Sequence, residues 1–275
     1  MADRNSGCSV VTGLIVFAFL NLGSCSYFQV NHEDFRLRHL ALLILATAIG
    51  CSQSASDRND VIDNPQQATA ATAVGTPWGG LRKQTAGVPL EEADQIVVLL
   101  HGYGATEFDL VPLAEYIGGD SRAFVFPAAP YSVGGGGLAW ATTEEELATT
   151  RAKLASLVLF ASQTYPNAEI SIGGFSQGAT VSSMLLADST LPIRHLILYS
   201  PALAIDLSSI ESRHSIRVLL AHGKSDDVLP FADSKRLHEM LERVGIEVNW
   251  LPFDGGHTIT TELLDATRDQ LSKKM

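Results

Sequence analysis

Cysteine is scarce in this chain and is confined to its N-terminal end. The 275 residues include only three cysteines, Cys8, Cys25 and Cys51, so the sequence from Ser52 onward has no thiol. A cysteine nucleophile, a thiolate metal site and a stabilising disulfide are therefore excluded from the larger part of the chain.

Positive charge is also scarce. The sequence has 19 Lys and Arg residues against 30 Asp and Glu residues, which gives a formal net charge of −11. Binding to a nucleic acid needs a positive patch that displaces counterions from the phosphates, and this composition does not indicate one. We therefore expect no nucleic-acid partner.

The sequence also lacks long apolar runs. A bilayer-spanning helix needs about 20 apolar residues, and no run in this chain reaches that length. Two shorter runs, 10–22 and 40–50, have the length of the apolar core of a secretory signal. The second run ends in Ala-Ile-Gly followed by Cys51, which resembles the lipobox of bacterial lipoproteins. This resemblance implies that Cys51 is the lipidated first residue of the mature protein. The first run ends in Leu-Gly-Ser followed by Cys25, which resembles the same motif and is the alternative.

Residues 52–76 are rich in small polar residues and alanine and show no apolar periodicity. This composition is typical of a flexible tether, with an r.m.s. reach of about 28 Å. We predict a targeting region at 1–51, a linker at 52–76 and one domain at 77–275. The protein is then expected in the cell envelope, lipid-anchored on the periplasmic side of a bacterial membrane. The alternative is two short membrane-associated helices without processing.

From residue 95 onward, short apolar runs alternate with longer segments of helical spacing. Continuous apolar runs are typical of strands buried on both faces in a parallel sheet covered by helices. The predicted strands are 96–100, 123–126, 170–172, 196–199, 218–221 and 248–251, and the predicted helices are 144–163, 177–187, 231–244 and 260–271. Thr142 and Thr143, each three residues before a glutamate, predict capping boxes for the first helix. The alternation predicts a three-layer α/β fold with a mostly parallel central sheet.

The sequence Gly-Phe-Ser-Gln-Gly at 174–178 follows a predicted strand and precedes a predicted helix. This is the context of a G-x-S-x-G nucleophile turn, which exposes its serine at a helix N-terminus. We expect strained dihedral angles at Ser176, and glycines on both sides because a Cβ there would collide with the backbone. The partial positive charge of the helix N-terminus favours an oxyanion beside Ser176.

A serine hydroxyl needs a base that takes its proton, and on such a fold the acid and the histidine follow the serine in the chain. Asp226 and Asp227 lie after the predicted strand 218–221, and His257 lies after the strand 248–251. His101 and His222 each precede a glycine at a strand end. There we expect the imidazole to brace the loop by hydrogen bonding.

Four motifs occur in a recognisable order. They are His-Gly-Tyr-Gly at 101–104, Gly-Phe-Ser-Gln-Gly at 174–178, His-Gly-Lys-Ser-Asp-Asp-Val-Leu-Pro at 222–230 and Gly-His at 256–257. With these motifs the chain resembles the phospholipase/carboxylesterase family of α/β-hydrolases, which includes acyl-protein thioesterases. The resemblance extends over residues 81–271 and implies the α/β-hydrolase fold. It puts Asp226 in the catalytic position, with Asp227 as the alternative, and His257 as the base.

The resemblance also implies an oxyanion hole made by the backbone amides of Tyr103 and Gln177. It places Trp140 at the wall of the acyl site, with core packing as the alternative. The glycines at 134–137 are expected to form a mobile lip. No metal-binding motif accompanies these residues, so we expect catalysis without a cofactor or a metal.

Together these observations predict a serine carboxylesterase that hydrolyses carboxylic esters, thioesters or lysophospholipids through Ser176, His257 and Asp226. The expected partners are a small-molecule or lipid ester and the membrane, and the protein is expected to be a monomer or homodimer. The alternatives are a peptidase or dienelactone-type hydrolase on the same fold, or a non-catalytic lipoprotein that keeps the fold as a binding module.

Overall fold

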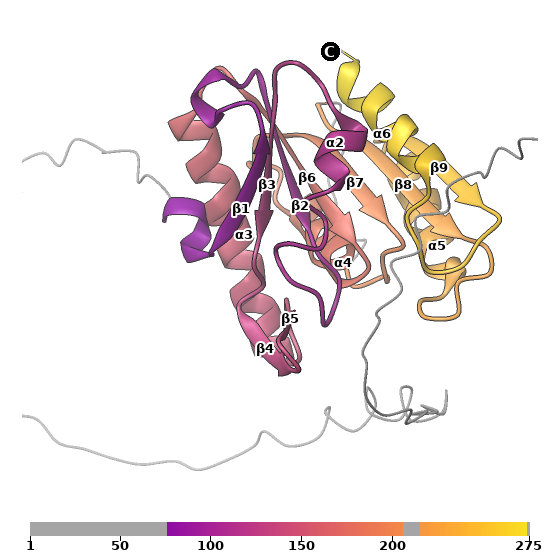
Figure 1. The fold of residues 1–275 in the computed structure, drawn as a ribbon. Helices are drawn as coiled ribbons and strands as arrows, with labels where there is room; N and C mark the ends of the chain where they lie inside the picture. The colour runs from indigo at the N-terminus through magenta and orange to yellow at the C-terminus, as the bar shows by residue number, and fades with distance from the viewer. Residues whose placement is uncertain (1–75, 206–214, 274–275) are drawn as a thin grey trace, which may run out of the picture. The chain divides into compact units, whose positions relative to one another are not determined.

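The computed structural model describes residues 76–205 and 215–273. Seven strands form one sheet in the order β1-β3-β2-β6-β7-β8-β9 (Figure 1). The edge strand β1 pairs with β3 in the antiparallel direction, and the other neighbours are parallel. The strands are β1 (Lys83–Gly87), β2 (Gln95–Leu100), β3 (Arg122–Pro127), β6 (Glu169–Phe175), β7 (Ile193–Tyr199), β8 (Arg217–Gly223) and β9 (Glu247–Phe253).

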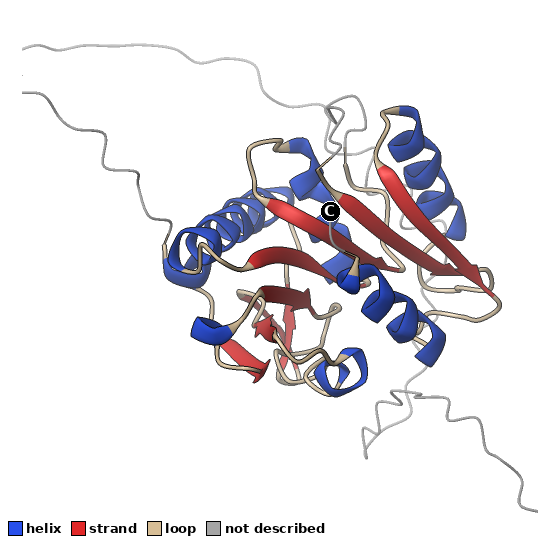
Figure 2. Ribbon diagram, turned by 90° about the horizontal axis from the view of Figure 1, so that it is seen from above, coloured by secondary structure: helices blue, strands red, loops and turns tan. Residues whose placement is uncertain are grey.

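Helices cover both faces of this sheet (Figure 2). One face packs against α2 (Leu113–Ile117) and α6 (Thr261–Ser272). The other face packs against α3 (Glu144–Thr164), α4 (Gln177–Ser183) and α5 (Phe231–Arg243). Short 3-10 turns lie at η1 (Pro77–Gly80), η2 (Leu90–Glu92) and η3 (Met184–Ala187), and a small hairpin joins β4 (Tyr131–Gly134) to β5 (Gly137–Ala139). The predicted three-layer α/β fold is therefore confirmed.

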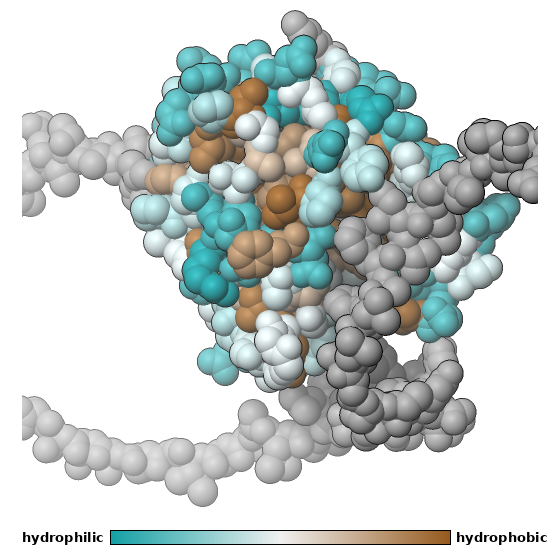
Figure 3. Space-filling model, viewed as in Figure 1, coloured by the Kyte–Doolittle hydropathy of each residue, from teal (hydrophilic) through white to brown (hydrophobic). Residues whose placement is uncertain are grey.

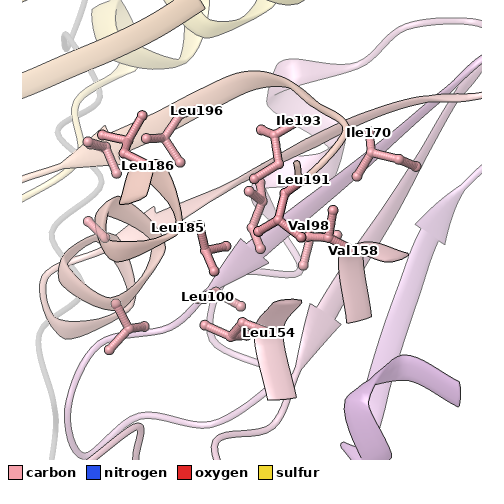
Figure 4. Close-up of a cluster of buried hydrophobic side chains, with 14 of the residues drawn as sticks. Val98, Leu100, Leu154, Val158, Ile170, Leu185, Leu186, Leu191, Ile193 and Leu196 are labelled. Carbon is pink, nitrogen blue, oxygen red and sulfur yellow. The ribbon is translucent and has the colours of Figure 1, made fainter. Parts of the chain in front are cut away.

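The apolar runs form strands because both sides of the sheet are buried. In β2, Val97 and Leu99 belong to one core cluster, whereas Val98 and Leu100 belong to the other. Figure 4 shows Val98 and Leu100 among the leucines and valines of the second cluster, beside Leu154 of α3. Burial of each such side chain contributes roughly 1.5–3 kcal/mol, so a polar residue at alternate positions would weaken one of the two layers.

All six predicted strands are present, each extended by one or more residues. The structure adds elements that the apolar pattern did not reveal, namely β1, the β4–β5 hairpin and the short helix α2. The predicted helix 177–187 is divided, because α4 ends at Ser183 and continues as the 3-10 turn η3. The hydroxyls of Ser182 and Ser183 donate to carbonyls one turn back, at 2.8 and 2.7 Å, and such bonds compete with regular helix geometry.

The start of α3 confirms one of the two predicted capping boxes in part. The Thr143 hydroxyl accepts a hydrogen bond from the Glu146 N–H at 3.2 Å, as predicted. The Glu146 carboxylate accepts from both the N–H and the hydroxyl of Thr142, each at 2.6 Å, so Thr142 is paired with Glu146 instead of Glu145. These contacts satisfy backbone donors that a helix N-terminus leaves without partners.

The predicted targeting region at 1–51, with Cys25 and Cys51, lies outside the described residues, as does the linker up to residue 75. Across 76–205 and 215–273, none of the helices has the length and apolar character that a membrane crossing requires.

Candidate active site

Four loops that carry the predicted site residues follow strands of the parallel part of the sheet. Tyr103 follows β2, Ser176 follows β6, Asp226 follows β8 and His257 follows β9. The carboxyl ends of parallel strands lie at one edge of a sheet, which is where α/β folds build their sites. The topology therefore brings together residues that are up to 154 positions apart in the sequence, since 257 − 103 = 154.

Ser176 lies in the predicted sharp turn between β6 and α4. Its backbone has φ 56° and ψ −120°, in a region that residues with a Cβ rarely adopt. Such a conformation costs about 1–3 kcal/mol and persists only where neighbouring contacts hold it. Here the Ser176 N–H donates to the Tyr199 carbonyl and the Ser176 carbonyl accepts from the Thr180 N–H, both at 2.9 Å. The expected strain at the serine is confirmed.

The two glycines that flank this turn leave no room for a side chain. A Cβ on Gly174 or on Gly178 would lie 2.2 Å from the carbonyl oxygen of Leu100, far inside van der Waals contact. The last residue of β2 thus packs directly on the nucleophile turn. The predicted reason for both glycines, a collision with backbone, is confirmed.

Asp226 and His257 form a hydrogen-bonded pair. The His257 Nδ1 lies 2.7 Å from the Asp226 Oδ2. The Asp226 side chain is fully buried and that of His257 is 13% exposed. Asp227, the alternative acid, is exposed on the same loop. Of the two carboxylates, Asp226 is the one that contacts the imidazole.

Hydrogen bonds keep the buried Asp226 carboxylate ionised. Burial alone would raise the pKa of Asp226, but the Leu229 N–H, the His257 ring and the Val228 N–H outweigh it and hold the pKa below its usual value. Both backbone donors bind Oδ1, each at 2.9 Å, and His257 binds Oδ2. An ionised acceptor at Nδ1 keeps the proton on that nitrogen and leaves Nε2 without one.

The His257 ring also contacts the nucleophile turn. Its centroid lies 4.6 Å from that of Phe175, the residue directly before Ser176, with 38° between the ring planes. The imidazole is therefore held between the acid loop on one side and the serine turn on the other. This contact places the imidazole beside the turn that carries Ser176.

The loop after β2 lies beside the serine. A Cβ on Gly102 would lie 3.4 Å from the Ser176 Cβ, so the two backbones approach closely. Among the described residues, the backbone N–H groups of Tyr103 and Gln177 are not used in a hydrogen bond. Two free donors next to a serine are the elements of an oxyanion hole.

His101 braces this loop, as expected. Its Nδ1 lies 2.8 Å from the Gly102 carbonyl, and its Nε2 accepts from the Ala129 N–H at 3.1 Å. These partners assign the proton to Nδ1 of a neutral ring. Burial lowers the pKa of His101, which keeps the ring neutral.

Trp140 lies in the core beneath the same loop. It has no exposed surface, and its indole N–H donates to the His101 carbonyl at 2.8 Å. The packing alternative thus describes its position. The motifs predicted a role only for the backbone of Gln177, but its side chain also makes two hydrogen bonds. The Gln177 side chain accepts from the backbone N–H of Trp140 at 2.8 Å and donates to the Ala141 carbonyl at 2.7 Å.

The glycines at 134–137 form the turn of the β4–β5 hairpin. Two backbone hydrogen bonds join this hairpin to the loop after β2. The Gly104 N–H donates to the Leu138 carbonyl at 2.8 Å, and the Leu138 N–H donates to the Ala105 carbonyl at 3.0 Å. The base of the hairpin is therefore attached to the candidate site. The predicted mobility of its tip stays a prediction.

Three exposed apolar side chains lie on loops that also carry candidate site residues. Tyr103, Phe108 and Val228 are each at least 60% exposed and lie on the loops after β2 and β8. On the face shown in Figure 3, hydrophobic surface occurs in small patches between hydrophilic residues. A surface cavity of about 580 Å³ lies elsewhere, between α3 and η3, and none of the predicted site residues lines it.

Comparison with known proteins identifies the class of this chain. Acyl-protein thioesterase 1 of Gibberella zeae is 30% identical over 115 residues, which cover 38% of this chain and about half, 48%, of that relative. The crystal structure of esterase PE8 is 26% identical, with a TM-score of 0.61, and covers 70% of this chain and 97% of its own. The carboxylesterase from Mesorhizobium loti is 23% identical, with a TM-score of 0.58, and covers 67% and 91%. The fold is that of the α/β-hydrolases, and the class is that of hydrolases acting on ester bonds.

The family follows from a match over most of the described domain. Residues 87–275 match the phospholipase/carboxylesterase family, and the chain belongs to it. The resemblance of the four motifs to this family is thus confirmed, for the family and for the fold.

Proposed function

We propose that the protein is a serine carboxylesterase in which Ser176 is the nucleophile, His257 the base and Asp226 the orienting acid. The observation that carries this proposal is the 2.7 Å contact between His257 Nδ1 and Asp226 Oδ2, on loops beside the strained serine turn. A fully buried carboxylate on one ring nitrogen leaves the other free to accept a proton.

The reaction proceeds through two displacements at the acyl carbon. The Ser176 Oγ attacks the carbonyl while His257 Nε2 takes its proton, and the Tyr103 and Gln177 N–H groups stabilise the oxyanion. Collapse of the tetrahedral intermediate breaks the ester bond, and His257 returns the proton to the departing alcohol. Water then attacks the acyl-enzyme with His257 as base, which releases the acid and restores Ser176.

The substrate class that we propose is carboxylic esters, including thioesters and lysophospholipids. Thioesters are included because one relative carries the name acyl-protein thioesterase. The exposed apolar side chains around the site fit an acyl chain or a lipid ester. This mechanism requires neither a metal nor a cofactor. The names of the relatives do not favour a peptidase or a dienelactone-type hydrolase, and the hydrogen-bonded Asp226–His257 pair argues against a purely binding role.

We further propose that Cys51 carries a lipid anchor, with residues 52–76 as the tether to a domain at 77–275. The support is the lipobox-like sequence before Cys51 and the polar composition after it. The enzyme would then act beside a bacterial membrane, as a monomer or homodimer.

The test is Ser176→Ala in the full chain, with Ser132→Ala on the exposed β4 strand as the matched control. We expect a fluorophosphonate probe to label Ser176 in the wild type and the control. In Ser176→Ala, kcat for p-nitrophenyl esters should fall about 10³-fold or more, with unchanged circular dichroism. Activity that survives Ser176→Ala, or a label on another residue, would overturn the proposal.

A further inference from the structure

A second histidine, to which the mechanism assigns no role, contacts the carboxylate of Asp226. His222 is the penultimate residue of β8, and its side chain is fully buried. Its Nε2 lies 3.2 Å from the Asp226 Oδ2 and 3.1 Å from the Leu229 carbonyl oxygen. His222 and His257 therefore meet the same carboxylate oxygen from two different strands.

The partners of His222 define where its proton lies. Nε2 faces a carboxylate oxygen and a carbonyl oxygen, and both of these only accept hydrogen bonds. We therefore assign the proton to Nε2, so that Nδ1 accepts from the Ser234 hydroxyl, which lies 2.6 Å away on α5 and 3.4 Å from the Pro201 carbonyl oxygen. The Ser234 side chain is itself fully buried, so this contact is shielded from water.

The surroundings keep the ring neutral. Burial lowers the pKa of His222 and prevails over the hydrogen bond to Leu229 and the negative charges of Asp226 and Asp233, which act in the opposite direction. His257 is the other titratable group that faces it, and a positive charge there lowers the pKa of His222 further. Burial thus favours the neutral form of the His222 ring, which donates through one nitrogen only.

His222 adds a fourth polar contact to the carboxylate, beside the three hydrogen bonds that the carboxylate accepts. An ionised carboxylate offers about four acceptor positions. Oδ1 accepts from the N–H groups of Val228 and Leu229, and Oδ2 accepts from His257 and faces His222. The carboxylate cannot rotate without breaking one of these contacts, and its negative charge is shared among all of them.

We propose that His222 is a positioning residue whose Nε2–H orients the Asp226 carboxylate and limits how strongly that carboxylate holds a proton on His257. This inference deepens the proposed function and rests on it. Without the donor, the charge on Oδ2 acts on His257 alone. The imidazolium of His257 becomes more stable. His257 then loses its proton, and can act as a base, only at a higher pH.

The test compares His222→Gln with His222→Met in the full chain. The two side chains have nearly the same length, but only glutamine carries an N–H donor near the position of Nε2. We expect His222→Gln to stay within a few-fold of the wild-type kcat. His222→Met should lower kcat about 10-fold, leave KM nearly unchanged and move the acid limb of the pH profile upward by about half a pH unit or more. Equal kcat values and equal acid limbs for the two variants would overturn the inference.

A measurement on the wild-type chain keeps the inference testable if both variants unfold. Nitrogen NMR of protein labelled with 15N-histidine should show His222 as the neutral Nε2–H tautomer across the acid limb. A charged ring or an Nδ1–H tautomer would overturn the inference. The proposed function fails separately, through activity that survives Ser176→Ala, and that result would leave the His222 tautomer unchanged.

Discussion

Gly178, in the first turn of α4, packs against the carbonyl oxygen of Leu100, the last residue of β2, so closely that a Cβ at Gly178 would lie 2.2 Å from that oxygen. This contact holds the N-terminus of the nucleophile helix against the strand that leads into the Tyr103 loop. It therefore sets the separation between the two backbone amides of the proposed oxyanion hole, those of Tyr103 and Gln177.

Gly178→Ala should destabilise the protein. The added Cβ meets backbone atoms, which cannot move aside as a flexible side chain would, so α4 must shift from β2. We expect the free energy of unfolding to fall by about 2 kcal/mol or more, measured by urea denaturation. The matched control is Gly256→Ala, whose added Cβ would come no closer than 3.8 Å to the Ser225 carbonyl oxygen. A loss of stability no larger than that of the control would contradict the packing argument.

Gln177→Met should slow the chemical step with little effect on binding. Methionine has nearly the shape of glutamine, but it cannot accept from the backbone N–H of Trp140 or donate to the Ala141 carbonyl. The backbone N–H of residue 177 remains, but the turn that aims it loses two hydrogen bonds. We expect kcat for p-nitrophenyl acetate to fall about 10-fold while KM changes little.

Gln163→Met, on the exposed side of α3, is the control for the same chemical change away from the site. It should keep the wild-type kcat. Equal activity of the two variants would show that the Gln177 side chain has no part in positioning the oxyanion hole.

Acid should destabilise the protein through His195. This side chain is fully buried, and among the described residues neither ring nitrogen has a hydrogen-bond partner. Burial, with Arg217, Arg194 and Arg122 adding repulsion, lowers the pKa of His195 from 6.5 to about 4. The unfolded chain therefore binds the proton more readily, and the free energy of unfolding should fall as the pH falls from 6.5 toward 4. The expected loss is about 2–3 kcal/mol between pH 7 and pH 4.5.

His195→Leu should remove the part of this dependence that His195 contributes, because leucine has no proton to bind and leaves no buried nitrogen without a partner. Urea denaturation at pH 7 and pH 4.5 gives the two free energies for each protein. His238→Gln is the control, since His238 lies on α5 with its side chain 17% exposed and near Glu242. If His195→Leu lost as much stability as the wild type over this range, another group would be responsible.

Much of the fold could be predicted because burial on both faces leaves a clear mark on a sequence. The strand at 95–100 consists almost wholly of apolar residues, and the structure buries every one of its side chains. The edge strand β1 was missed because its residues, Lys-Gln-Thr-Ala-Gly, are only partly buried and its partner β3 is distant in the chain. The division of α4 from η3 was missed because it depends on which carbonyls the serine hydroxyls reach.

The predicted site residues were found from motif order alone, and the roles given to them stay predictions. The motif resemblance favoured Asp226 and kept Asp227 as the alternative, because neighbouring residues on a loop differ in the direction of their side chains. The structure turns Asp226 inward to His257 and leaves Asp227 exposed. No sequence pattern indicated that the Gln177 side chain bonds Trp140 and Ala141, since those contacts join segments 36 and 37 positions apart.

The sequence alone determined the class of fold, the family and the turn that carries Ser176. Apolar periodicity and short motifs are local, so they can be recognised without coordinates. The tertiary structure decided which carboxylate meets His257, how the Gln177 side chain contacts Trp140, and that His222 and His257 contact the same oxygen of Asp226. Those relationships depend on distances between separate strands and loops, which form only when the sheet brings its carboxyl ends together.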